Sequence, residues 1–146
     1  MNAHIFFRKF SGFLILSFLV VSCRVALVPE YSAQLEEQIS NAAKATDRLY
    51  LDMLDVPLAT RTYENFKDRY NEIESEINSI KLKNEARLKN ADFIIINKNL
   101  KSAFDEAKTY HKDHTTLSNG EIKAYQSTLA GFWRPLYFAE KGLKGS

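Results

Sequence analysis

The stretch YENFKDRYNEIESEINSI, residues 63–80, decides the fold of this chain. Its apolar side chains are separated by alternating steps of three and four residues: Tyr63, Phe66, Tyr70, Ile73, Ile77 and Ile80. This spacing places them on one face of an α-helix that packs lengthwise against other helices. Thr60 or Thr62 can cap the first turn.

The segment before this stretch shows the same helical spacing. Its apolar positions are Tyr31, Leu35, Ile39, Ala42, Leu49 and Met53. Pro29 suits the first turn of such a helix, where its missing N–H is not needed. The sequence Asp55-Val56-Pro57 ends it. We therefore expect a second helix that begins at about residue 29.

The segment after residue 80 contains the boundary between the next two helical patterns. The apolar pattern weakens near Asn84 and Asn90, where we place a turn, and resumes from about Asp92 to Tyr110 or His111. If no turn forms there, the domain has three long helices instead of four. The run 93–96 alone would suit a buried strand, but it has no partner strand and the helical pattern continues past it.

The last helix has a clear start signal. Ser118 and Glu121 have the spacing of a capping box, in which each side chain binds the backbone N–H of the other residue. The apolar face continues through Ile122, Tyr125, Leu129, Phe132, Leu136, Ala139 and Leu143. Pro135 lies inside this helix and should kink it, because its ring meets the carbonyl of Gly131.

Four helices joined by short connections predict an all-α domain over residues 29–146. The expected architecture is an antiparallel up-down-up-down four-helix bundle. The alternative is three long helices.

The first 22 residues do not belong to this domain. Arg8 and Lys9 precede a charge-free apolar run from Phe10 to Val21. A short basic head followed by about 7–15 apolar residues is typical of a secretory signal peptide. The run is shorter than the roughly 18 residues that a membrane-spanning helix needs.

The end of this run, Leu19-Val20-Val21-Ser22-Cys23, resembles the lipobox of bacterial lipoproteins. The resemblance implies that residues 1–22 are removed and that Cys23, the only cysteine, is lipidated, so that the protein sits on a membrane of the cell envelope. Two or more acyl chains anchor a protein stably. Residues 23–28 would be the lipidated cysteine and a short tether. Arg24 is not the aspartate that retains lipoproteins in the inner membrane, so in a Gram-negative host the resemblance implies the outer membrane, facing the periplasm.

The charge of the mature chain argues against nucleic-acid binding. Without Arg8 and Lys9, the basic residues fall from 20 to 18 and equal the 18 acidic residues. Nucleic-acid binding usually leaves a basic surplus. The sequence contains no Gly-x-Ser-x-Gly, His-Glu-x-x-His or phosphate-binding glycine loop, so we expect no catalysis and no cofactor.

Three groups of residues are candidate sites. His111 and His114 share a helix face and could bind zinc, although His111 could equally continue the apolar face.

If Phe132, Leu136 and Ala139 face the core, the neighbouring aromatic residues spread to the flanks. They could form an exposed partner-binding patch or fill the bundle. The patch would consist of Trp133, Arg134, Tyr137 and Phe138. A set of basic residues could rest on anionic headgroups, or it could reflect only the preference of basic side chains for helix C-termini. The set is Arg24, Lys81, Lys83, Arg87 and Lys89.

These observations favour a membrane-anchored envelope lipoprotein that acts as a non-catalytic protein-binding or scaffold module. Its partners would be the membrane, through the lipid anchor, and an unidentified envelope protein. The alternative is a periplasmic small-ligand or metal-binding bundle. The sequence does not indicate an oligomeric state.

Overall fold

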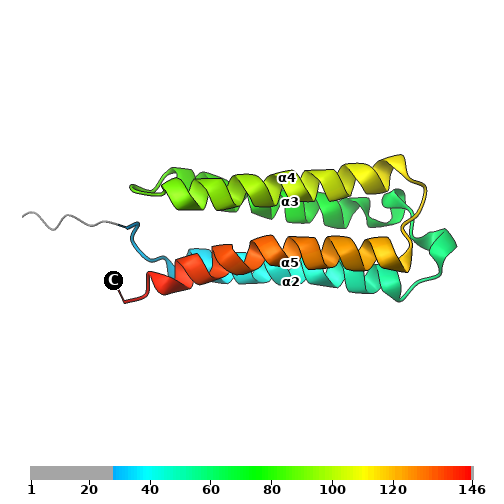
Figure 1. The fold of residues 1–146 in the computed structure, drawn as a ribbon, viewed down its shortest axis with the longest axis horizontal. Coiled ribbons are helices and arrows are strands. Elements are labelled where there is room, and N and C mark those ends of the chain that lie inside the picture. The colour runs from blue at the N-terminus through cyan, green and yellow to red at the C-terminus, as the bar shows by residue number, and fades with distance from the viewer. Residues whose placement is uncertain (1–27, 146) are drawn as a thin grey trace, which may run out of the picture.

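The computed structural model describes residues 28–145, and these form a four-helix bundle without a strand. The helices are α2 (Ala33–Leu54), α3 (Tyr63–Glu85), α4 (Ala91–Asp113) and α5 (Asn119–Gly142), with a short 3-10 helix, η1 (Leu58–Thr60), between α2 and α3. Figure 1 shows successive helices running in opposite directions. The predicted all-α fold is confirmed, and the alternative of three long helices is wrong.

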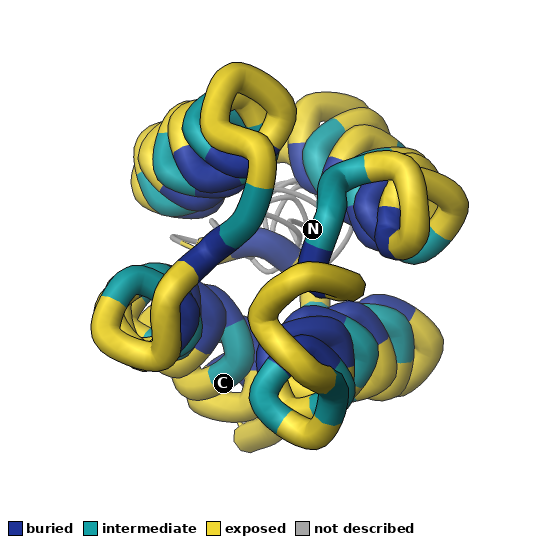
Figure 2. Tube along the Cα trace, turned by 90° about the vertical axis from the view of Figure 1, so that its right-hand side faces the viewer, coloured by how far each residue is buried: buried dark blue, intermediate teal, exposed yellow. Residues whose placement is uncertain are grey.

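Each helix packs against two neighbours around a common core. Helix α2 contacts α3 and α5, and α4 contacts the same two helices. Figure 2 shows that the buried residues of all four helices face the centre. We call the end that carries residue 28, the α3–α4 turn and the C-terminus of α5 the proximal end. The opposite end, with the α2–α3 and α4–α5 connections, is the distal end (Figure 1).

The start of α2 differs from the prediction. Pro29 is buried but precedes the helix, which begins at Ala33. Ser32 is the N-cap, and its hydroxyl accepts a hydrogen bond from the backbone N–H of Leu35 at 3.2 Å. A serine at this position binds one of the N–H groups that a helix start leaves unpaired, so it determines where the helix begins.

The α3–α4 turn lies where the apolar pattern weakens. The amide of Asn90 donates to the carbonyl oxygens of Asn84 at 2.6 Å and Glu85 at 3.1 Å, which are among the last carbonyls of α3. Lys89 adopts a left-handed backbone conformation with φ of 58°. A residue in this conformation reverses the chain after a helix. These two residues therefore separate α3 from α4.

The start of α5 is the predicted capping box. The Ser118 hydroxyl accepts from the N–H of Glu121 at 3.3 Å, and the Glu121 carboxylate accepts from the N–H of Ser118 at 2.8 Å. Pro135 lies inside α5, which continues through it to Gly142. The kink at Pro135 stays a prediction.

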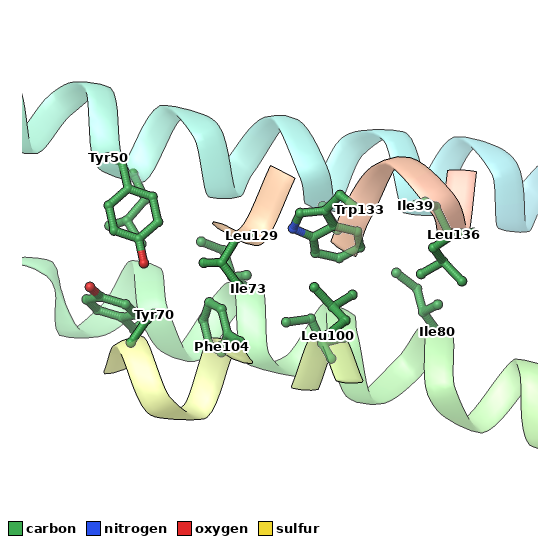
Figure 3. Packing of buried hydrophobic residues seen from close by; sticks show 14 of the residues in the cluster. Ile39, Tyr50, Tyr70, Ile73, Ile80, Leu100, Phe104, Leu129, Trp133 and Leu136 are labelled. Atoms are coloured by element: carbon green, nitrogen blue, oxygen red, sulfur yellow. The ribbon is translucent and has the colours of Figure 1, made fainter. Parts of the chain in front are cut away.

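The core is filled along its whole length. Figure 3 shows its central side chains stacked from Tyr50 and Tyr70 at one end to Ile39, Ile80 and Leu136 at the other. Trp133 is in this core and Phe132 is only half-buried, so the prediction that places Trp133 on a flank is wrong. Helix α5 is turned so that Trp133 and Glu140 face inward, while Phe132 and Ala139 pack against the side of the core.

Candidate functional site

A groove runs between α2 and α5. It consists of two adjoining hollows of about 350 and 280 Å³, which share Ala43, Lys44, Trp133 and Arg134. The hollow nearer the distal end is completed by Thr46, Asp47, Tyr50, Gln126 and Ala130. The hollow nearer the proximal end is completed by Ser40, Tyr137 and Phe138. We call the two together the α2–α5 groove.

Trp133 forms the floor that both hollows share. Its side chain is only 3% exposed, and Figure 3 shows the indole among the core side chains. The indole N–H donates to the hydroxyl of Thr46 at 3.1 Å, and that hydroxyl donates to the carbonyl of Ala42 at 2.9 Å. These hydrogen bonds and the surrounding core fix the orientation of the ring at the floor of the groove.

The rim of the proximal hollow is aromatic and accessible. Phe138 is 63% exposed. It meets Tyr137 edge to face, with ring centroids 5.6 Å apart. The Lys141 ammonium lies over the ring of Tyr137, 5.6 Å from its centroid. The tyrosine is thus held between two side chains, while the phenylalanine projects into solvent.

The charges of the proximal hollow are all positive. Its only charged lining residues are Lys44 from α2 and Arg134 from α5. Among the residues that the structure describes, neither forms an ion pair or a side-chain hydrogen bond. The distal hollow adds Asp47, whose carboxylate accepts a hydrogen bond from the amide of Gln126 at 2.7 Å. The proximal hollow is therefore apolar with two available cations.

The structure thus brings together all four residues of the predicted aromatic patch, but in unequal roles. Arg134, Tyr137 and Phe138 line the rim, whereas Trp133 contributes mainly its buried ring. The α2 half of the site was missed by sequence reasoning: Ser40, Ala43 and Lys44. Two small residues three positions apart leave room for large rings on a neighbouring helix, but this signal alone does not say which helix that is.

The two histidines of the proposed metal pair have separate partners. His111 is buried, and its Nε2 lies 2.8 Å from the carbonyl oxygen of Arg61. His114 is exposed, stacks on Tyr110 with centroids 3.8 Å apart, and its Nδ1 lies 2.8 Å from the Tyr110 carbonyl oxygen. Between residues 28 and 145, no three His, Cys, Asp or Glu side chains gather as a metal site would require.

His111 belongs to a buried polar chain near the distal end. Because the Arg61 carbonyl can only accept, Nε2 carries the proton, and Nδ1 accepts from the hydroxyl of Tyr70 at 3.1 Å. The Tyr50 hydroxyl points toward that of Tyr70 (Figure 3). Burial lowers the pKa of His111 and raises the pKa of both tyrosines, so all three side chains are neutral at pH 7.

The basic residues proposed to meet a membrane lie at the proximal end but are not equally available. Lys81 is 3.6 Å from the carboxylate of Glu85, and Lys83 donates to the amide oxygen of Gln38 at 2.7 Å. Lys89 makes no ion pair with any described residue. Cys23 and Arg24 lie outside the described residues.

Arg87 is the remaining described member of this basic set, and its side chain binds groups within the domain. Its guanidinium pairs with the fully buried carboxylate of Glu140 at 2.6 Å and also donates to the backbone carbonyl of Glu30. The second oxygen of Glu140 accepts from the backbone N–H of Ser32 at 2.8 Å. Arg87 therefore joins the entry segment 30–32 to the end of α5.

Comparison with known proteins adds no assignment to this geometry. No protein-family model, curated protein sequence or solved structure shows significant similarity to this chain. From residue 28 to residue 145, no helix has both the length and the apolar character needed to cross a bilayer.

Proposed function

We propose that this chain is a lipid-anchored protein of the bacterial cell envelope whose helical domain binds another envelope protein without catalysis. The anchor is Cys23, and in a Gram-negative host the domain faces the periplasm from the outer membrane. The binding site is the proximal part of the α2–α5 groove. Each part of this proposal has its own support and its own experiment.

The observation that carries the binding proposal is the composition of the proximal hollow. Phe138 is 63% exposed beside the half-buried Tyr137, and both line an apolar hollow, so the accessible apolar atoms are contiguous. Covering one phenylalanine contributes on the order of 1.5–3 kcal/mol. Aromatic and arginine side chains around such a pocket are the usual centre of a protein interface.

The charges of the hollow indicate the chemistry of the partner. Lys44 and Arg134 stand on opposite helices on either side of an apolar floor. A segment that inserts apolar side chains and carries carboxylates would satisfy both features. We therefore propose an amphipathic segment of an envelope protein with acidic residues beside its apolar face.

Photo-crosslinking in living cells tests this site. A photoreactive amino acid replaces Phe138 in the full chain, and the matched control places it at Ile95, an apolar residue of α4 that is 57% exposed and does not line the groove. We expect position 138 to capture a peptide with apolar and acidic residues, and position 95 not to capture it. Replacing Lys44 and Arg134 with glutamine should reduce the capture.

Three results would contradict the groove proposal. One is equal capture at positions 138 and 95. Another is a captured peptide without carboxylates. The third is capture that does not change when Lys44 and Arg134 are neutralised. All four substituted positions, 44, 95, 134 and 138, are exposed, so none of these substitutions removes a buried side chain.

The anchor is tested separately by metabolic labelling. Cells that express the full chain are supplied with a labelled fatty acid. We expect the label on this protein and its complete loss in Cys23→Ala, with Ser22→Ala as a control that keeps a small residue before the cysteine. Unlabelled wild-type protein would contradict the anchor but not the groove.

A further inference from the structure

Two leucines at the proximal end are exposed and flanked by bases. Leu88, in the α3–α4 turn, is 85% exposed, more than any other large apolar side chain among residues 28–145. Leu82, near the end of α3, is 68% exposed. The sequences around them are Lys81-Leu82-Lys83 and Arg87-Leu88-Lys89. At a membrane interface, long basic side chains can keep their charged ends among the headgroups while an apolar neighbour enters the layer below.

The turn that presents Leu88 is held by hydrogen bonds on both sides. Arg87 is fastened to Glu140 and to the Glu30 carbonyl, and Asn90 is bonded to the end of α3. Lys89 between them has the left-handed backbone that reverses the chain. The exposure of Leu88 is therefore a property of an ordered turn.

The entry segment of the domain is fastened to this same end. The N–H of Ser32 donates to Glu140, and the carbonyl of Glu30 accepts from Arg87. Pro29 is buried. Only residues 24–28 separate the proposed anchor, Cys23, from this fastened segment. Five residues extend less than about 20 Å. If Cys23 is lipidated, the turn with Leu88 is kept close to the bilayer surface.

Positive charge at the proximal end is local to the α3–α4 turn. Lys81 pairs with Glu85, and Lys83 donates a hydrogen bond to the neutral amide of Gln38. Lys83 and Lys89 thus carry the charge that no described ion pair offsets, with Asp92 nearby. On the α2 and α5 side of this end, Glu30, Glu36 and Glu37 offset Lys141 and Lys144. Net charge alone thus does not distinguish this end; the exposure of Leu88 beside basic residues does.

We infer that the α3–α4 turn is a second membrane contact, in which Leu88 enters the interfacial layer of the bilayer and Lys89 and Lys83 meet anionic headgroups. This inference rests on the proposed lipid anchor and goes beyond it. Two attachments at one end hold the bundle upright, with the distal end about 35 Å from the surface for helices of 22–24 residues. The α2–α5 groove then opens sideways, parallel to the membrane.

The test uses the full lipidated chain reconstituted into vesicles of phosphatidylcholine, with or without an equal part of phosphatidylglycerol. An environment-sensitive fluorescent amino acid replaces Leu88. The control replaces Leu58, which is 53% exposed at the distal end. Lipids with a quencher on the upper acyl chain report depth. We expect a blue shift and strong quenching at position 88, neither at position 58, and more quenching at position 88 with phosphatidylglycerol.

Charge variants make the test sharper. Lys83→Gln and Lys89→Gln should each shift the docked population at position 88 about fivefold toward the undocked state in anionic vesicles. Equal, water-like emission at positions 88 and 58 would overturn the inference. A chain that does not stay with the vesicles would overturn it together with the anchor. Neither result bears on the crosslinking at position 138, which tests the groove proposal by itself.

Discussion

The ion pair between Arg87 and Glu140 shows how single buried residues stabilise this bundle. The Glu140 side chain is fully buried, and the Arg87 side chain is 15% exposed. Burying a carboxylate costs free energy, and here the guanidinium and the Ser32 N–H offset that cost. The pair joins the α3–α4 turn, the end of α5 and the entry segment, which are distant in sequence.

Removing one partner of this pair should strongly destabilise the protein. We expect Arg87→Met to lower the free energy of unfolding by about 3–5 kcal/mol, because it leaves the carboxylate of Glu140 buried and unpaired. Urea unfolding of the full chain measures this. Arg69→Met is the matched control, since its ion pair with Asp52 is more exposed and should contribute about 1 kcal/mol or less. A similar loss in both variants would argue against this explanation.

His111 should make stability depend on pH. Burial lowers its pKa in the folded protein, whereas the unfolded chain binds a proton at about pH 6.5. The unfolded state therefore binds more protons below pH 6.5, and the free energy of unfolding should decrease as the pH falls from 6.5 to 5. Unfolding curves across this range should show the decrease in the wild type and in His114→Gln, but not in His111→Gln. A decrease that persists in His111→Gln would assign it to other groups.

Two of the four described helices, α2 and α5, begin at a serine whose side chain caps the first turn. Ser32 and Ser118 each accept a hydrogen bond from an N–H of the first turn that would otherwise have no partner. At the other end of α3, Asn90 supplies the amide that binds the last carbonyls. Each of these contacts joins residues no more than six positions apart.

The cap of α5 provides a prediction for one element. We expect Ser118→Ala to lower the free energy of unfolding by about 1 kcal/mol, because the N–H of Glu121 loses its acceptor. Chemical unfolding followed by far-ultraviolet circular dichroism measures the change. The control is Ser127→Ala at an exposed position inside α5, which should be neutral or slightly stabilising since alanine is the better helix former. Equal effects at both positions would show that the capping box does not contribute.

The bundle as a whole should unfold as one unit. Each helix borders two others, and the buried cluster extends along all four, so no pair of helices keeps its core when the others are lost. Small single domains of this kind usually unfold in a two-state transition. Trp133 is the only tryptophan and lies in that core. We expect its fluorescence and the helical circular dichroism signal to change with the same midpoint in urea; two midpoints would indicate an independent part.

The arrangement of the helices around the core also decides which residues the groove presents. On α5, the predicted face and the observed face share Ile122, Leu129 and Leu136, and Leu143 just after the helix is also buried as predicted. By helical spacing alone, either Phe132 or Trp133 could face the core between Leu129 and Leu136. The Thr46 hydroxyl on α2 accepts the indole N–H, and Arg87 accommodates Glu140 on the same face. Helix α5 is rotated accordingly, and Phe138 is left on the surface.

Local sequence is sufficient for the number of helices, the capping box of α5 and the position of the α3–α4 turn, because apolar periodicity and capping contacts act over a few residues. It also indicates the aromatic stretch from which half of the groove is built. The rotation of α5, the α2 half of the groove and the burial of Arg87 and Glu140 come from contacts between residues up to 108 positions apart. Such contacts exist only when the helices are packed, so tertiary structure alone decides which side chains are buried partners and which remain available for binding.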